Sequence, residues 1–239
     1  MIKHRNYYDL IKPKKGEKKR DRSYPNEDKV NISLPARVLI AAPSGAGKTN
    51  TLRNIIDDIG VFDQIVLWAK DLDEPLYKDL IERCRKVEAK LKVKILLAIS
   101  TGADLPSVDD WDPKDNNLLI CDDLITEDKK SLALLDPYFV RGRHQDITMF
   151  FLTQGFFDVP KLIRKNVNYV ILKKIKNERD LGRIVKQYAG QATQKELRDM
   201  YRYAMKGDPF DSFFMIDAQT KDENLQYRAN YEGIGNMSH

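Results

Sequence analysis

A glycine-rich turn between an apolar run and a stretch of helix formers is the segment with the most recognisable chemistry. Residues 38–41 predict a strand, and the apolar spacing of residues 52–56 predicts a helix after the turn. Glycines allow backbone N–H groups to point into one concavity at a helix start, where they bind phosphate. We expect Lys48 to reach the β- and γ-phosphates of a nucleotide and the Thr49 hydroxyl to ligate Mg²⁺. The predicted phosphate loop consists of Pro43, Ser44, Gly45, Ala46, Gly47, Lys48 and Thr49, with Ala42 where glycine is usual.

Two adjacent carboxylates follow a second apolar segment. Residues 117–121 predict a short strand, and Asp122 and Asp123 come directly after it. Ligands bind beyond the carboxyl ends of strands in open α/β sheets, so these acids should face the phosphate loop. We expect Asp122 to hold Mg²⁺ through its water shell and Asp123 to polarise the water that attacks the γ-phosphate. The alternative is a solvated Asp-Asp turn.

A polar amide ends a third predicted strand, residues 147–153. Gln154 can sense the γ-phosphate or position the attacking water. Arg141 and Arg143 precede this strand, and an arginine at the edge of a sheet can reach a nucleotide bound by a neighbouring subunit. Both arginines could instead form a solvated basic turn or contact DNA.

With these elements the chain resembles the FtsK–HerA superfamily of DNA-pumping ATPases, and more narrowly the genome-packaging ATPases of large DNA viruses and virophages. The resemblance covers roughly residues 34–218. Cellular members usually have Asp-Glu where this chain has Asp122-Asp123, and Asp-Asp fits the viral group. An arginine lies the same distance before the Thr-Gln or Ser-Gln pair in the superfamily as Arg143 lies before Gln154, which favours Arg143 over Arg141. The residues that carry the resemblance are 43–49, 122–123, 141–144, 153–154 and 157–166.

The resemblance implies ATP and Mg²⁺ as cofactors and a homo-oligomeric ring that hydrolyses ATP at its subunit interfaces, with Arg143 acting in trans. It implies double-stranded DNA as a substrate that is gripped without regard to sequence, and capsid or portal-like vertex proteins as partners. The expected location is the host cytoplasm or a virus factory, with association with the virion left open.

Composition is compatible with this function. The chain has 239 residues, which is long enough for one α/β domain with a sizeable core. Hydrophobic residues make up 42% of it, which is typical of a globular protein. The net charge of +5 favours a polyanionic partner. No apolar run approaches the roughly 20 residues of a membrane-spanning helix, and no signal peptide is visible, so we expect a soluble, intracellular protein. Cys84 and Cys121 do not form a disulfide framework or a zinc site.

Strands alternate with helices along the chain, which predicts a mostly parallel sheet with helices on both faces; the resemblance makes it a P-loop NTPase sheet of the RecA/ASCE type. We expect a basic, mobile arm at residues 1–33, the ATPase core at 34–218 and a C-terminal strand and tail at 219–239. The arm could tether DNA or a capsid, or be a solvated tail. Expected strands cover residues 37–42, 64–68, 93–99, 118–121, 147–152 and 169–172, with a closing hairpin at 212–218 and 224–230. Expected helices cover 48–59, 75–92, 129–140 (kinked or ended by Pro137), 177–188 and 193–205.

Two sets of side chains receive specific expectations. The apolar residues of the helix at 75–92 should face the core: Leu76, Leu80, Ile81, Cys84, Val87 and Leu91. The basic residues after the last two parallel strands could line the channel of a ring and grip phosphates, or be solvated: Lys161, Arg164, Lys165, Lys173, Lys174 and Lys176.

Three other functions use the same motifs. A small-molecule or nucleoside kinase would need an acceptor pocket, and the Asp122-Asp123 pair and Gln154 argue against it. A second alternative is a non-catalytic nucleotide switch or a DNA-binding protein of the capsid. The presence of both Lys48 and Asp123 argues against it. These residues do not distinguish a packaging ATPase from a HerA-like translocase that acts in DNA processing.

Overall fold

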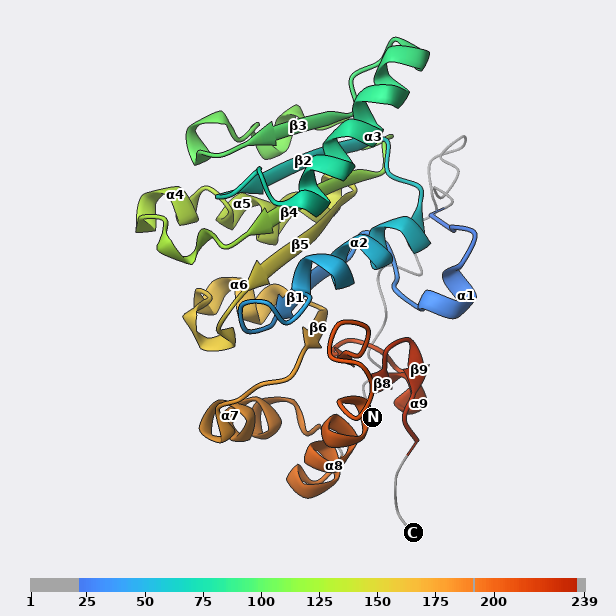
Figure 1. Cartoon of the computed structure of the whole chain (residues 1–239), viewed down its shortest axis with the longest axis vertical. Coiled ribbons are helices and arrows are strands. Elements are labelled where there is room, and N and C mark those ends of the chain that lie inside the picture. The colour runs from blue at the N-terminus through green and yellow to red at the C-terminus, as the bar shows by residue number, and fades with distance from the viewer. Residues whose placement is uncertain (1–21, 191, 236–239) are drawn as a thin grey trace, which may run out of the picture.

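A computed structural model describes residues 22–190 and 192–235, which form a twisted central sheet flanked by helices (Figure 1). The strand order is β3-β2-β4-β5-β1-β6-β7-β8-β9. Strands β3 to β6 in this order are parallel, and β7, β8 and β9 continue the sheet in antiparallel fashion. The strands are β1 (Arg37–Ala41), β2 (Gln64–Ala69), β3 (Leu96–Ile99), β4 (Asn117–Asp122), β5 (Ile147–Thr153), β6 (Tyr169–Leu172), β7 (Phe214–Asp217), β8 (Tyr227–Ala229) and β9 (Glu232–Gly233).

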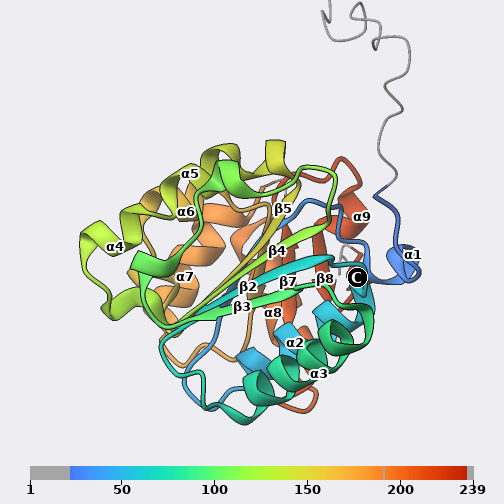
Figure 2. The ribbon, with the colours of Figure 1, turned by 90° about the horizontal axis from the view of Figure 1, so that it is seen from above.

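Helices cover both faces of the sheet (Figure 2). Helices α2 and α3 pack on one face, and α5, α6, α7 and α8 pack on the other. The helices are α1 (Glu27–Val30), α2 (Lys48–Ile59), α3 (Pro75–Leu91), α4 (Lys129–Ala133), α5 (Asp136–Arg141), α6 (Lys161–Asn166), α7 (Glu178–Tyr188), α8 (Gln194–Ala204) and α9 (Glu223–Gln226). This arrangement confirms the predicted mostly parallel α/β fold.

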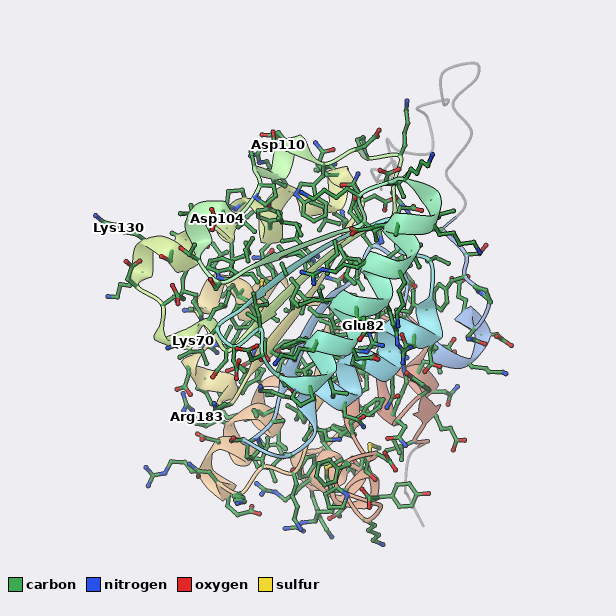
Figure 3. The ribbon with its side chains drawn as sticks, turned by 45° about the horizontal axis from the view of Figure 1, so that its top comes forward. Lys70, Glu82, Asp104, Asp110, Lys130 and Arg183 are labelled. Carbon is green, nitrogen blue, oxygen red and sulfur yellow. The ribbon has the colours of Figure 1, made fainter. Side chains whose placement is uncertain are left out.

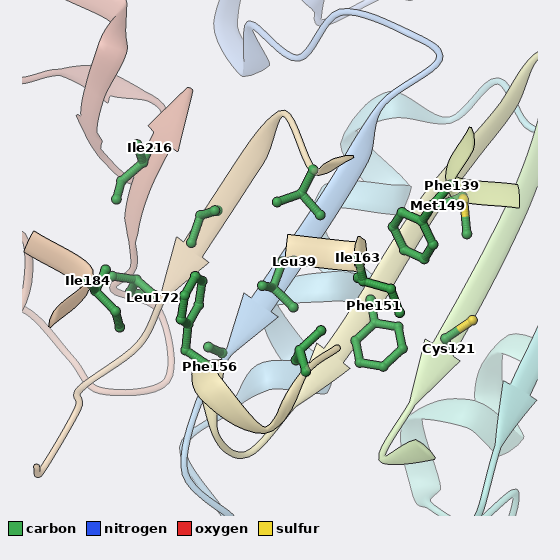
Figure 4. Packing of buried hydrophobic residues seen from close by; sticks show 14 of the residues in the cluster. Leu39, Cys121, Phe139, Met149, Phe151, Phe156, Ile163, Leu172, Ile184 and Ile216 are labelled. Carbon is green, nitrogen blue, oxygen red and sulfur yellow. The ribbon is translucent and has the colours of Figure 1, made fainter. Parts of the chain in front are cut away.

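The two hydrophobic cores follow from the alternation of side chains along the parallel strands. Every residue of β1 is buried, with Leu39 in the core under α5 to α8 and Ile40 in the core under α2 and α3. Phe151 of β5 packs in the same core as Leu39 (Figure 4). Strands buried on both faces are continuous apolar runs, which is why the sequence indicated them clearly.

Three element boundaries differ from those expected. Strand β3 begins at Leu96, because the Glu88 side chain accepts hydrogen bonds from the amides of Ile95 and Leu96 at 2.7 and 2.8 Å. Pro137 lies in the first turn of α5 and not inside a longer helix, so residues 129–141 form two short helices. The closing hairpin of β7 and β8 is confirmed, although residues 223–226 form α9 before β8 starts.

The expectation for the end of α3 is wrong. Val87 and Leu91 are 42% and 58% exposed, whereas Leu80 and Cys84 are buried as expected. Helix α3 has 17 residues and lies beside β3, a four-residue strand at the edge of the sheet, so its last turns extend beyond the surface that could cover them (Figure 1).

The packed part of the chain begins before residue 34, so the predicted arm is too long. Tyr24, Val30 and Ile32 are buried in the core beside α2, and the Tyr24 hydroxyl donates a hydrogen bond to the Ile32 carbonyl at 2.9 Å. The basic residues 12–20 of the predicted arm lie outside the described residues.

A buried arginine joins this N-terminal segment to the C-terminal hairpin. Arg228 on β8 is 1% exposed and donates hydrogen bonds to the carbonyls of Val30 and Asn31, at 3.2 and 2.9 Å. Its guanidinium also pairs with Asp217 of β7 at 3.0 Å. Because β7 and β8 extend the sheet, residues after 218 belong to the packed structure and are not only a tail.

The surface is highly charged. Acidic and basic side chains of both signs project from it, as Lys70, Glu82, Asp104, Asp110, Lys130 and Arg183 show in Figure 3. Within the described ranges no helix has the length and apolar character needed to cross a membrane. Cys84 and Cys121 are both buried and unpaired.

We predict that Arg228→Met lowers the free energy of unfolding by about 3–5 kcal/mol, because it leaves Asp217 Oδ2 and three backbone carbonyls, those of Val30, Asn31 and Leu225, without the guanidinium as donor. Chemical denaturation measures this change. Arg202→Met, at an exposed position of α8, is the matched control and should change stability by less than about 0.5 kcal/mol. Equal effects of the two substitutions would contradict the structural role of Arg228.

Candidate functional site

The glycine-rich turn has the backbone conformation that a phosphate loop needs. Gly45 and Gly47 have φ values of +72° and +79°, in the left-handed region that favours glycine. Gly47 is the N-cap of α2, so the free N–H groups of the first helical turn open toward the turn. Ala42 is buried and lacks a positive φ, which explains why alanine suffices at this position.

An open pocket of about 910 Å³ lies at this turn, beyond the carboxyl ends of the parallel strands. It brings together the predicted residues Lys48, Thr49, Asp122, Asp123 and Gln154 with three residues of the turn, Ser44, Gly45 and Gly47. Pro43 and Ala46 are outside the lining and form the turn behind it, closed by a hydrogen bond from the Ala46 amide to the Pro43 carbonyl at 3.1 Å.

Lys48 and Asp122 form an ion pair across the pocket. The Lys48 Nζ lies 3.0 Å from Asp122 Oδ1, and both side chains are largely buried. The other carboxylate oxygen accepts a hydrogen bond from the Tyr77 hydroxyl at 2.7 Å. Burial and the neighbouring Asp122 raise the pKa of Tyr77, so its phenol stays protonated and remains a donor.

The residues fit a magnesium ion at this position. Asp122 Oδ1 is buried at the pocket, where Lys48 is its partner at 3.0 Å. Tyr77 holds the other carboxylate oxygen, so Oδ1 and the buried Thr49 hydroxyl of the same pocket would be the protein ligands of the ion. Mg²⁺ is usually bound by one or two carboxylates together with substrate phosphates, so a larger acidic cluster is not needed.

Asp123 and Gln154 are adjacent. The Gln154 Nε2 donates to both Asp123 carboxylate oxygens at 3.3 Å. Asp123 has a φ of +56°, which is uncommon for a residue other than glycine and turns the chain sharply just after β4. Such conformations concentrate at functional sites. The carboxylate is therefore directed into the pocket beside an amide that can share a water molecule with it.

The arginines lie far from this pocket. Arg143 is exposed before the start of β5, and Gln154 follows the end of this seven-residue strand, so roughly 20 Å of sheet separates them. Arg141 pairs with Asp109 through contacts of 3.3–3.5 Å. Arg143 has no such partner among the described residues, and neither arginine reaches the pocket of its own chain.

Sequence reasoning missed the contribution of the segment after β2. Lys70, Asp71, Glu74 and Leu76 line the pocket. Burial raises the pKa of Glu74, and the nearby Thr49 hydroxyl partly offsets this effect. Residues 70–71 follow the carboxyl end of a parallel strand, and this position could have indicated that they line the pocket. Tyr77 could not be found in this way, because its place among the apolar residues of α3 predicts only that it packs in the core.

Two of the basic residues predicted to grip phosphates are not available for it. Lys173 is fully buried, and its Nζ donates to the Phe210 carbonyl at 2.8 Å and to Thr51 Oγ1 at 3.1 Å. Arg164 donates to the Val159 carbonyl at 2.9 Å and lies over the ring of Phe157. The remaining members of the set are exposed: Lys161, Lys165, Lys174 and Lys176.

Comparison with known proteins gives matches to viral proteins. A family model described as "Poxvirus A32 protein" matches residues 27–207. Uncharacterized protein 075L of Invertebrate iridescent virus 6 is 25% identical over 215 residues, covering 87% of this chain and 80% of that protein.

Solved structures share the fold. B204, the DNA-packaging ATPase from Sulfolobus Turreted Icosahedral Virus, aligns with a TM-score of 0.55 at 13% identity, covering 85% of this chain and 100% of the other. The genome packaging NTPase B204 from Sulfolobus turreted icosahedral virus 2, in complex with ATP-gammaS, aligns with a TM-score of 0.52 at 12% identity, covering 84% and 98% of the two chains. The family match and the fold shared with the B204 structures confirm the predicted resemblance to genome-packaging ATPases of viruses.

We predict a pH-dependent contribution of Lys173 to stability. Burial lowers the pKa of Lys173 to about 8 from its ordinary 10.5. Between these two values the unfolded chain binds more protons than the folded chain, so stability rises with pH across this window, and below about pH 8 the cost of burying the charge is constant. The unfolding free energy of wild type relative to Lys173→Met should therefore increase by on the order of 3 kcal/mol from pH 8 to 10.5.

Denaturation at a series of pH values tests this expectation. Lys174→Met, at the exposed neighbouring position, is the control and should show no such change relative to wild type. A difference between wild type and Lys173→Met that stays constant with pH would contradict the prediction.

Proposed function

Because the chain belongs to the Poxvirus A32 protein family, we propose that it is an ATP-driven double-stranded DNA translocase that packages a viral genome into a capsid. The observation that carries the proposal is the convergence of Lys48, Thr49, Asp122, Asp123 and Gln154 on one pocket. The B204 proteins of similar fold are a DNA-packaging ATPase and a genome packaging NTPase, and one of them binds ATP-gammaS, which supports ATP as the ligand.

The ion pair at the pocket suggests how nucleotide binding prepares the site. Lys48 can leave Asp122 for the β- and γ-phosphates, because these anions replace the carboxylate as its partner. Asp122 is then free to hold Mg²⁺ together with the Thr49 hydroxyl. Magnesium held there would supply positive charge against the negative charge that develops on the phosphates in hydrolysis. Tyr77 keeps the Asp122 carboxylate oriented throughout.

The hydrolytic step falls to Asp123 and Gln154. Asp123 accepts a proton from the attacking water, and the Gln154 amide, which hydrogen-bonds the same carboxylate, orients that water and senses the γ-phosphate. A further cation at the open side of the pocket would stabilise the charge that develops on the γ-phosphate.

In our proposal a ring of identical subunits supplies this cation. Arg143 is exposed and has no ion-pair partner among the described residues, whereas Arg141 is engaged by Asp109. Since Arg143 lies at the opposite end of β5 from Gln154, it can act only on the nucleotide of an adjacent subunit. The exposed lysines 161, 165, 174 and 176 are the basic side chains that could contact the DNA backbone, in a manner independent of sequence. We further propose capsid or portal-like vertex proteins as docking partners and the virus factory or host cytoplasm as the place of action.

We predict that Asp123→Asn retains binding of ATP and Mg²⁺ but lowers kcat by about 10²–10⁴-fold, because an amide has nearly the same shape as a carboxylate and is a far poorer base. Steady-state ATPase assays with double-stranded DNA and equilibrium nucleotide binding measure the two effects. Asp122→Asn is the matched comparison and should weaken Mg²⁺-dependent binding. If the two phenotypes were exchanged, the division of roles between the carboxylates would be wrong.

Arg143→Ala should bind ATP normally and lose about 10³–10⁵-fold in turnover, because a finger stabilises only the transition state. Rings mixed from Arg143→Ala and Lys48→Ala subunits should recover part of the activity that each lacks alone, since one provides an intact pocket and the other an intact arginine. ATPase activity as a function of mixing ratio measures this recovery. Recovery with Arg141→Ala in place of Arg143→Ala, and none with Arg143→Ala, would assign the finger to Arg141.

A further inference from the structure

We propose that Phe210 is the platform on which the base of the bound nucleotide stacks. Phe210 lies in the loop between α8 and β7 and lines the pocket next to the phosphate loop. This inference rests on the proposed function, because it requires that the triphosphate occupies the loop at residues 43–49.

The order of the strands sets the direction of the nucleotide. Asp123 and Gln154 follow β4 and β5, the phosphate loop follows β1, and Lys173 and Phe210 belong to the segments that adjoin β6 and β7. The order β4-β5-β1-β6-β7 therefore places the hydrolytic residues and Phe210 on opposite sides of the phosphate loop. With the γ-phosphate at Asp123 and Gln154, the ribose and base extend toward Phe210.

The Phe210 ring is exposed although its backbone is held firmly. The side chain is 56% exposed, which is unusual for a phenylalanine. Its carbonyl accepts hydrogen bonds from Lys173 Nζ at 2.8 Å and Asn50 Nδ2 at 3.4 Å, and its amide donates to Asp208 Oδ1 at 2.7 Å. An apolar surface that is ordered before the ligand arrives adds affinity because little entropy is lost on binding.

The loop also contacts the phosphate loop directly. A Cβ on Gly47 would lie 3.2 Å from Phe210 Cδ1 and 3.3 Å from its carbonyl oxygen, closer than most such contacts. Gly47 thus allows the Phe210 segment to lie against the start of α2. The ring is held next to the helix end that takes the phosphates, within reach of a base attached to them.

Lys173 explains how this position is maintained. Its ammonium is fully buried and joins Thr51 of α2 to the Phe210 carbonyl. Burying a lysine ammonium is costly unless hydrogen bonds within the protein replace those to water. Here these bonds fix the distance between the helix that follows the phosphate loop and the loop that carries the ring, which a stacking site requires.

The test compares ATP with inorganic tripolyphosphate as competitors for the pocket of the full-length protein, measured by isothermal titration calorimetry with Mg²⁺. Phe210→Ala and Phe210→Leu should weaken ATP binding by about 5- to 100-fold, the range expected for loss of one base–aromatic stack. Tripolyphosphate binding should change less than about twofold, and Phe210→Tyr should bind ATP like wild type. Tyr203→Ala, which removes an exposed aromatic ring from α8, is the matched control and should leave both ligands unaffected.

The leucine variant separates stacking from packing, because leucine keeps an apolar side chain over Gly47 and lacks an aromatic face. Wild-type ATP affinity in Phe210→Leu would overturn the proposal, as would a parallel loss of ATP and tripolyphosphate binding in Phe210→Ala. Failure of the wild-type protein to bind either ligand would instead overturn the proposed function, and the stacking site with it.

Discussion

The pocket depends on the ion pair between Lys48 and Asp122. The two residues come from elements that are not neighbours in the sheet, since β5 lies between β1 and β4. A largely buried carboxylate or ammonium without a partner would be strongly destabilising, so each group makes the burial of the other possible. Their 3.0 Å contact holds the phosphate loop and the acidic strand at one edge of the sheet. In the proposed function, phosphate replaces the carboxylate as the partner of Lys48, so the contact that stabilises the site also lies where the ligand would bind.

The parallel sheet distributes the parts of the site along that edge. Every parallel strand presents its carboxyl end on the same side, so the acidic pair Asp122-Asp123, Gln154 and the phosphate loop come from three strands and yet face one volume. The segment after β2 adds Glu74, and Tyr77 supports Asp122 from α3. A ligand in this volume is therefore contacted by residues more than 150 positions apart in the chain, from Ser44 to Phe210.

Buried polar side chains hold the outer segments in place. Arg228 connects residues 30 and 31 to the last hairpin, and Lys173 connects α2 to the loop before β7. Both bury a charge whose hydrogen bonds are made within the protein: Arg228 donates to backbone carbonyls and to Asp217, and Lys173 donates to the Phe210 carbonyl and the Thr51 hydroxyl.

Local patterns in the chain were sufficient to predict the parallel α/β fold and to place the glycine-rich turn, the acidic pair and Gln154 at one edge of its sheet. Gly45 and Gly47 supply the positive φ values of the turn, and parallel strands that are buried on both faces consist of continuous apolar runs. Each of these features can be recognised from a few consecutive residues. Lys173 looked like any surface lysine, and Val87 looked like a core residue, because burial depends on which distant segment packs against a position. For the same reason, only the tertiary structure shows that Tyr77 contacts Asp122 and that Phe210 lies against Gly47. It also shows that Tyr24 and Ile32 of the expected arm are buried, and that Arg143 is distant from the pocket of its own chain. These contacts join residues that are far apart in the sequence, and the residues next to each of them in the chain do not indicate its partner.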